Sequence, residues 1–184
     1  MIIFIDGPQS VGKSTLIEKS GFKNFKFEFS KLMKEFQLDE SQIPGYQLGK
    51  DLASLYWLDK LNPDEVWLID RGVMSSIYYS IIHNRLSSYQ IFKLFDYLKQ
   101  FKNLQYLFIK AENQPEIKRD KKDGFDTLDK EFNKDVLSTI YRECWSRNIP
   151  LHIFTNDFNE SIEENVLDFK EKIDSIARYL KWIQ

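Results

Sequence analysis

A glycine-rich segment near the amino terminus has the residue types and spacing of a phosphate-binding loop. Gly7 and Gly12 are followed by Lys13 and Ser14 in the pattern G-x-x-x-x-G-K-[ST]. In such a loop the backbone N–H groups turn inward toward phosphate oxygens, the lysine reaches the outer phosphates, and the hydroxyl ligates magnesium. The segment therefore predicts binding of ATP with Mg²⁺. The expected nucleotide-binding residues are Gly7, Pro8, Gln9, Ser10, Val11, Gly12, Lys13, Ser14 and Thr15.

A second polar group follows the apolar segment Val66–Ile69. Asp70 is placed to hold magnesium together with Ser14, and Arg71 to contact a phosphate or a transferring phosphoryl group. Ligands of open α/β sheets bind beyond the carboxyl ends of the strands, so these side chains should meet the phosphate loop at one edge. A simple ion pair between neighbours at the strand end is the alternative interpretation.

The residues that would receive the phosphoryl group carry weaker signals. Glu28 could act as a general base toward a sugar hydroxyl, whereas a monophosphate acceptor would need cations such as Lys31 and Lys34. Arg119, in a polar and lysine-rich segment, could close over the phosphates. The predicted catalytic residues are Lys13, Arg71, Glu28, Asp70 and Arg119. The predicted substrate-binding residues are Glu28, Phe29, Tyr46, Gln47, Trp57, Arg71 and Tyr78, although the aromatic ones also suit a hydrophobic core.

Alternating apolar and amphipathic segments predict the elements that position these residues. Five strands are expected, at Ile2–Ile5, Phe25–Phe29, Val66–Ile69, Tyr106–Ile109 and Leu151–Phe154. Helices are expected at Lys13–Ser20, Gln47–Leu61, Ser75–His83, Tyr89–Phe101, Leu128–Arg147 and Ile162–Ile183, with another opening at Pro115. This order predicts an α/β fold with a parallel sheet between helices. We expect a single domain over 1–184, built around the phosphate loop, with a lid at about 114–127.

Several segments together resemble the nucleoside and nucleoside-monophosphate kinase group, in particular thymidylate kinases and deoxynucleoside kinases. They are Phe4 to Thr15, Asp70-Arg71 with Ser75 or Ser76 and Tyr78, and Pro115-Glu116 with Arg119. The resemblance implies a P-loop three-layer sandwich, with a five-stranded parallel sheet in the order 2-3-1-4-5 and a basic lid over ATP. By analogy it also implies a homodimer. Thr155-Asn156-Asp157, expected as a loop after the fifth strand, resembles the segment of this group that contacts adenine.

Two departures from the group leave the acceptor open. Gly72 stands where deoxynucleoside kinases usually have serine and thymidylate kinases an aromatic residue, and the lid has more lysine than arginine. We expect an ATP- and Mg-dependent phosphotransferase that acts on a deoxynucleoside monophosphate or a deoxynucleoside. One alternative is a kinase for a hydroxyl of a polynucleotide, at a 5′ end or on a modified base. Another is a non-catalytic nucleotide-binding regulator.

Composition limits the other classes of function. The net charge of −2 gives no global basic field for duplex nucleic acid, and 42% hydrophobic residues are typical of a globular chain. Cys144 is the single cysteine, which excludes an internal disulfide and, with two histidines, a Cys/His metal cluster. We expect a cytoplasmic protein without a signal peptide or membrane span. The chain has no Asp-x-x-Gly and no Asn-Lys-x-Asp, which argues against a switch GTPase.

Overall fold

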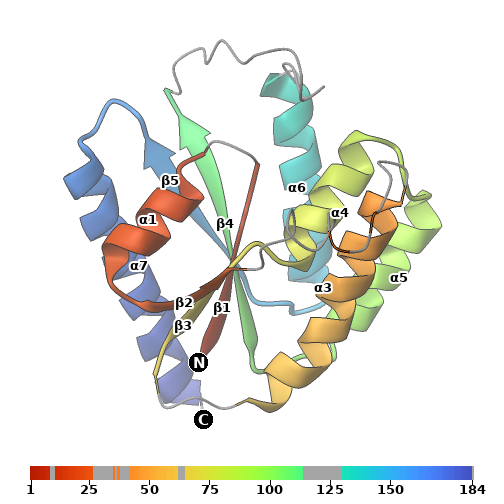
Figure 1. The fold of residues 1–184 in the computed structure, drawn as a ribbon, viewed down its shortest axis with the longest axis horizontal. Coiled ribbons are helices and arrows are strands. Elements are labelled where there is room, and N and C mark those ends of the chain that lie inside the picture. The colour runs from red at the N-terminus through yellow and green to blue at the C-terminus, as the bar shows by residue number, and fades with distance from the viewer. Residues whose placement is uncertain are drawn as a thin grey trace.

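A five-stranded parallel sheet forms the centre of the molecule (Figure 1). The computed structural model describes residues 1–8, 11–26, 35, 37, 42–61, 65–113 and 130–183, with backbone alone at 43–44, 130–134 and 180–183. The strands are β1 (Ile2–Asp6), β2 (Lys23–Lys26), β3 (Trp67–Asp70), β4 (Leu104–Glu112) and β5 (Leu151–Asp157). Their order, β2-β3-β1-β4-β5, confirms the predicted fold.

Helices cover both faces of this sheet. They are α1 (Lys13–Ser20), α3 (Ile43–Lys60), α4 (Val73–Ile82), α5 (Ser88–Leu98), α6 (Lys130–Ser146) and α7 (Ile162–Ile183). In Figure 1, α1 and α7 lie on one side of the sheet, and α3, α4, α5 and α6 lie on the other. No helix in the described ranges combines the length and apolar character needed to cross a membrane.

The central strand β1 is buried on both faces, as its uninterrupted apolar sequence predicts. Because neighbouring side chains of a strand point to opposite faces, β1 contributes to two separate cores. Ile2 and Phe4 pack with residues of α3, α4, α5 and α6, whereas Ile3 and Ile5 pack with α1 and α7. The two cores hold β1 rigidly, and its carboxyl end leads directly into the glycine-rich loop.

Several elements differ in length from the prediction. The helix α3 begins at Ile43 instead of Gln47, with proline in its first turn, where its missing N–H is not needed. The strand β5 runs to Asp157, so Thr155-Asn156-Asp157 is strand and the expected loop was wrong. These polar residues pair with the end of β4, and the backbone ladder continues whatever the side chains are. The helix expected at Pro115 and the lid lie outside the described residues.

A half-buried histidine in β5 predicts a specific loss of stability in acid. His152 Nε2 lies 3.1 Å from Gln105 Oε1, and burial, assisted by the charge of Lys172, lowers the pKa of His152 to about 4. Between pH 6.5 and 4 the unfolded chain binds a proton that the folded chain does not, so stability falls as the pH falls.

His152→Gln keeps a donor for Gln105 and removes the titration. Between pH 7 and pH 4, wild type should lose roughly 3 kcal/mol more unfolding free energy than the variant. Urea unfolding of both proteins across this pH range measures the difference. Equal losses of unfolding free energy in wild type and variant would contradict the prediction.

Candidate active site

The phosphate loop connects β1 to α1 at the carboxyl edge of the sheet. Its backbone has positive φ at Gly7 (135°) and at Gly12 (85°). A Cβ atom at Gly7 would overlap the carbonyl oxygen of Ile109, and one at Gly12 would lie 2.6 Å from Asn156 Nδ2. Both positions therefore require glycine, because a side chain would meet both an unfavourable dihedral angle and a neighbouring atom. Two of the predicted nucleotide-binding residues, Gln9 and Ser10, lie outside the described residues.

The start of α1 leaves backbone donors available for an anion. Gly12 is its N-cap and makes no side-chain capping hydrogen bond. The first N–H groups of a helix have no intrahelical acceptor, and the helix dipole adds positive potential at this end. Such a terminus, reached through a glycine-rich loop, is suited to phosphate oxygens.

Lys13 lies in the loop with its ammonium already buried. Its side chain is 5% exposed, and Nζ donates to the carbonyl oxygens of Gly7, at 2.9 Å, and of Pro8. Burial, followed by the positive charge of Arg71, lowers the pKa of Lys13 to about 8, while Asp70 and Asp6 act in the opposite direction. The ammonium is thus held at the phosphate loop by weak neutral acceptors, which phosphate oxygens would replace with a stronger charge-assisted interaction.

Ser14 and Asp70 come together across 56 residues of sequence. Ser14 Oγ donates to Asp70 Oδ2 at 3.0 Å, and the Asp70 side chain is 6% exposed. The other oxygen, Oδ1, is buried and has no hydrogen-bond partner in the described part of the chain. A hydroxyl and a carboxylate with an unused oxygen beside a phosphate loop are suitable ligands for Mg²⁺, which prefers oxygen and completes its shell with phosphates and water. The residues therefore fit the predicted metal site.

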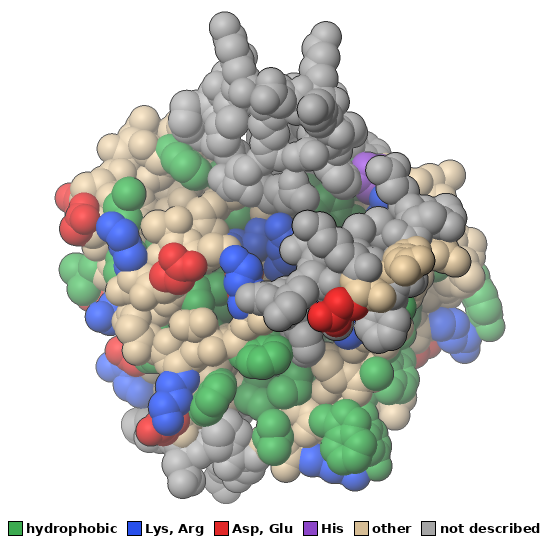
Figure 2. Space-filling view, viewed as in Figure 1, with side chains coloured by type: hydrophobic (Ala, Val, Ile, Leu, Met, Phe, Trp, Pro, Cys, Tyr) green, Lys and Arg blue, Asp and Glu red, His purple; other side chains and the backbone are tan. Residues whose placement is uncertain are grey.

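Arg71 adds a second positive charge next to this pair. It has φ of 69°, an uncommon conformation for a residue other than glycine, and its backbone N–H donates to Ile5 O at 3.0 Å. Its side chain is exposed, and its charge acts on Lys13. Figure 2 shows Lys and Arg side chains near the middle of this face. Lys13 is the first residue of α1, and Arg71 lies two residues before α4. This concentration of positive charge suits a polyphosphate.

A buried carboxylate that had no predicted role ties β1 to α4. Asp6 is fully buried, and its Oδ1 accepts three hydrogen bonds: from Gly72 N and Ser75 N, both at 2.9 Å, and from Ser75 Oγ at 2.7 Å. Ser75 Oγ in turn accepts from Gly7 N at 3.3 Å. Burial raises the pKa of Asp6 against the lowering effect of these donors. The sequence signal was an acid at the last position of an otherwise apolar strand.

This network predicts a large loss of stability for Asp6→Ala. The substitution leaves three buried donors without an acceptor, so the unfolding free energy should fall by about 3–5 kcal/mol. Asp6→Asn keeps an oxygen for those donors and avoids a buried charge, so it should cost less than about 2 kcal/mol. Urea unfolding of both variants measures the difference. Equal losses would contradict the role assigned to Oδ1.

A second buried acid, Asp51 on α3, also had no predicted role. Asp51 is 4% exposed, and its two oxygens accept from Ser76 Oγ at 2.5 Å and from Lys50 Nζ at 2.8 Å. Its charge is one cause of the raised pKa of Asp6, so the two carboxylates lie in one polar region. The usable signal was its spacing, because it falls between Leu48 and Leu55 on the apolar face of a helix.

Gly72, one of the two departures from the kinase group, has a packing reason in this chain. Its backbone is extended, and a Cβ atom there would overlap the ring of Phe4. Phe4 stacks on Tyr106 with ring centroids 5.5 Å apart, which fixes the ring against the backbone. The glycine therefore reflects the size of its neighbour in β1 and says nothing about the acceptor.

The predicted acceptor residues divide into two groups among those described. Tyr46 and Gln47 lie in the first turns of α3. The same half of this helix carries the buried Asp51. Trp57 lies near the other end of α3. Two residues later, Asp59 Oδ1 accepts from the backbone N–H of Asn103, just before β4 begins, so the structure does not bring Trp57 to the site.

Tyr78 lies in the core beneath the site. It is 1% exposed, and its ring centroid is 5.6 Å from that of Phe108. Trp57 and Tyr78 are therefore not among the acceptor contacts that we propose. Glu28, Phe29 and Arg119 lie outside the described residues.

A small cavity of about 220 Å³ lies beside the phosphate loop. Gly12 and Thr15 line it from one side, and Asn156 and Asp157 line it from the end of β5. Asn156 Nδ2 donates to Val11 O at 3.0 Å and so connects this strand end to the loop. The segment expected to contact adenine therefore lies next to the predicted phosphate site.

Solved structures share this fold over nearly the whole chain. A deoxyadenosine kinase from M. mycoides, solved with the products dCMP and dCDP, has 18% sequence identity and a TM-score of 0.54, covering 95% of this chain and 100% of that one. A thymidylate kinase from Ehrlichia chaffeensis has 14% identity and a TM-score of 0.57, covering 94% and 98%. A shikimate kinase from Bacteroides thetaiotaomicron has 13% identity and a TM-score of 0.51, covering 95% and 98%.

No family model and no curated protein sequence matches the chain. The structural similarity nevertheless defines its class of fold. The sheet order and the helices around it are those of the P-loop kinases, the nucleoside and nucleoside-monophosphate kinase group included, as the sequence resemblance implied.

Proposed function

We propose that this chain is an ATP- and Mg-dependent phosphotransferase that acts on a deoxynucleoside monophosphate or a deoxynucleoside. The observation that carries the proposal is the arrangement at the carboxyl edge of the sheet. A glycine loop leads into a helix terminus with free donors, and the Lys13 ammonium and the Ser14–Asp70 pair lie beside it. Phosphoryl transfer depends mainly on positioning and charge neutralisation, which these groups supply.

The described residues of the candidate site would each have a role in this mechanism. Lys13 would move from the loop carbonyls to the outer phosphates, and Arg71 would offset the charge that develops on the transferring group. Ser14 and Asp70 would hold Mg²⁺, which neutralises phosphate charge when bound. The amides at the start of α1 would orient the phosphates, and the adenine would occupy the cavity between Thr15 and Asn156.

The acceptor would bind on the α3 side of the site. Tyr46 and Gln47 remain proposed contacts, and the nucleoside and thymidylate kinases with this fold support an acceptor of that type. A nucleoside acceptor would need Glu28 as base, and Arg119 would serve in the lid; both roles rest on the sequence. We also propose a cytoplasmic homodimer by analogy with the resembled group, which sedimentation of the purified chain would check.

A panel of acceptors with labelled ATP and Mg²⁺ tests the proposal. It contains deoxynucleosides, deoxynucleoside monophosphates and single-stranded oligonucleotides, with Lys13→Ala protein as the control for contaminating kinases. Label in a monomeric acceptor, absent from the control, supports the proposal. Label in oligonucleotide alone would instead identify a polynucleotide kinase. Nucleotide binding without label in any acceptor would identify a regulator.

A further inference from the structure

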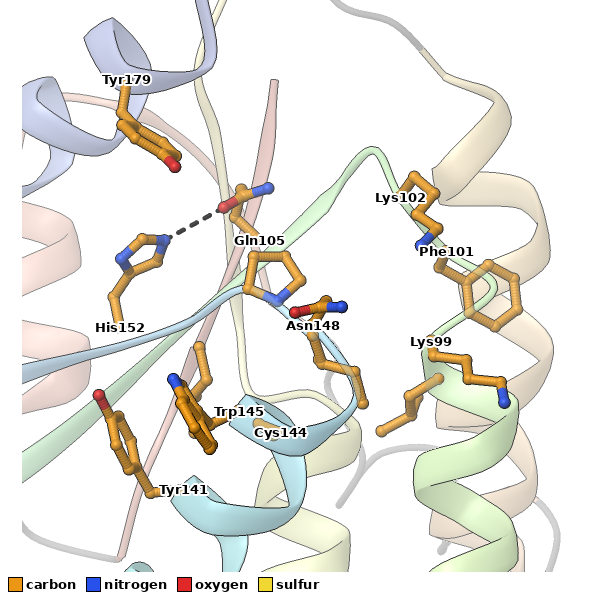
Figure 3. A pocket seen from close by; sticks show the side chains of 14 residues that line it. Lys99, Phe101, Lys102, Gln105, Tyr141, Cys144, Trp145, Asn148, His152 and Tyr179 are labelled. Atoms are coloured by element: carbon orange, nitrogen blue, oxygen red, sulfur yellow. Dashed lines mark hydrogen bonds between the residues drawn. The ribbon is translucent and has the colours of Figure 1, made fainter. Parts of the chain in front are cut away.

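A larger cavity, of about 460 Å³, lies at the opposite edge of the sheet from the phosphate loop. Gln105 and His152, which line it, are the second residues of β4 and β5, and the other walls come from the ends of α5, α6 and α7 (Figure 3). Parallel strands place all their amino ends at one edge, so this cavity is separate from the candidate active site. Its volume is within the range of small-ligand pockets.

Three exposed aromatic side chains surround the cavity. Tyr141 and Trp145 project from α6, and Tyr179 from α7, with exposed fractions of 47%, 75% and 63%. Single exposed aromatic residues are common and need no explanation, but three around one cavity form a surface on which a flat ring can stack. The lining therefore favours an aromatic ligand.

The charge of the lining is of one sign. Lys99 and Lys102 are the charged residues among the fourteen that line the cavity, and none of the fourteen is Asp or Glu. Neither lysine forms an ion pair with any residue that the structure describes. Asp96 lies within electrostatic reach of Lys99 but is hydrogen-bonded to Arg147, so the two lysines leave positive charge beside the aromatic surface and favour a ligand that carries an anionic group.

The side-chain amide of Gln105 offers a hydrogen-bond donor at the wall of the cavity. Gln105 is 2% exposed, and its Oε1 is occupied by His152 Nε2 at 3.1 Å. Its amide nitrogen points away from His152 in Figure 3 and has no hydrogen-bond acceptor among the described residues. This nitrogen is not one of the buried atoms that lack a partner, so it is accessible at the wall of the cavity that Gln105 lines, where an acceptor atom of a ligand can reach it.

We propose that this cavity binds a nucleoside monophosphate as a second ligand, at a site distinct from the site of phosphoryl transfer. Its base stacks on Trp145 and Tyr141 and accepts a hydrogen bond from the amide of Gln105. Its phosphate lies against Lys99 and Lys102. A nucleoside monophosphate combines the three features of the lining in one molecule: a flat ring, hydrogen-bond acceptors on that ring, and negative charge.

The side-chain NMR signals of Trp145 and Gln105 report binding directly. We would titrate ¹⁵N-labelled full-length protein with AMP, adenosine and ribose 5-phosphate. Both signals should move with one common dissociation constant for AMP. Adenosine should bind at least about fivefold more weakly, and ribose 5-phosphate about tenfold more weakly, because each lacks one half of the recognised group. Added salt should weaken AMP more than adenosine.

Substitutions separate this site from the active site. Trp145→Ala should weaken AMP binding, followed at Gln105, by about tenfold or more, and Lys99→Ala with Lys102→Ala by about threefold to tenfold. Trp57→Ala is the matched control, since Trp57 is 70% exposed on α3, away from both sites, and should change nothing. All four substitutions are at exposed positions, and unchanged urea unfolding verifies the fold.

Three results would each overturn the proposal. The first is an absence of saturable change at Trp145 and Gln105 at millimolar AMP. The second is an unchanged AMP affinity in Trp145→Ala. The third is a response of these signals to protein concentration instead of ligand, because a second copy of the chain would then cover the cavity.

Discussion

Replacing Lys13 with alanine should lower the rate of phosphoryl transfer by roughly 10²–10³-fold, the range seen when one preorganised charge-stabilising group is removed from an active site. In this chain no other described cation is held inside the phosphate loop, since Lys13 Nζ is fixed there by the carbonyls of Gly7 and Pro8. Arg71 is exposed and reaches the region from β3, so it does not replace a charge at the loop. Binding of MgATP should weaken along with turnover.

Steady-state rates with the best acceptor of the panel, and calorimetry with MgATP, measure the two effects. Lys19→Ala is the matched control, because Lys19 lies on the same helix, is exposed and forms a 3.7 Å surface pair with Glu163. It should change neither quantity, since such pairs contribute little. A Lys13→Ala protein with wild-type turnover would show that the loop does not hold the reacting phosphates.

Much of the fold and the phosphate site could be predicted because each depends on a local pattern. The apolar run of β1 and the glycine loop after it specify a buried strand and a phosphate cradle. The contact between Ser14 and Asp70 is distant in sequence, but the topology requires it. Ser14 follows β1 and Asp70 ends the neighbouring parallel strand β3, at the same edge, and the structure places Ser14 Oγ 3.0 Å from Asp70 Oδ2.

What could not be predicted depends on packing between distant elements. Asp6 and Asp51 look like an ordinary strand end and an ordinary helix acid until the start of α4 provides donors to both. An aromatic residue has the same sequence signature in a core and in a pocket, so Tyr78 and Trp57 were indistinguishable from Tyr46 before the packing of α4 and the direction of α3 were known. The cavity at the amino ends of β4 and β5 left no sequence motif, because its lining comes from several elements.

The buried acids also suggest how the active site is held in shape. Asp6 binds the first residues of α4, and Ser75 of that helix binds the backbone of Gly7, so the loop, β1 and α4 share one hydrogen-bond network. Asp51 extends the network from α3 through Ser76. The candidate acceptor side of the site is thus connected to the phosphate loop through buried hydrogen bonds of Asp51 and of Asp6 Oδ1, while Asp6 Oδ2 has no partner among the described residues.

Gly7→Ala should be the most destabilising single-methyl addition in the described chain. The backbone at Gly7 has φ of 135°, a conformation that other residues rarely adopt, and its new Cβ would overlap the carbonyl oxygen of Ile109. That oxygen belongs to the backbone of β4, which pairs with strands on both sides and has no rotamer by which to move away. We expect the unfolding free energy to fall by about 3–5 kcal/mol and MgATP binding to be lost.

Two other glycines separate the causes of this loss. Gly21 has φ of 76°, and no atom lies within 4 Å of the position that a new methyl group would take, so Gly21→Ala should cost about 1 kcal/mol, from the dihedral angle alone. Gly49 lies inside α3, also in open space, so Gly49→Ala should raise the unfolding free energy by about 0.5–1 kcal/mol. Urea unfolding ranks the three variants. If Gly7→Ala were no worse than Gly21→Ala, the loop would have shifted away from β4, and the phosphate cradle built on that close approach would no longer be supported.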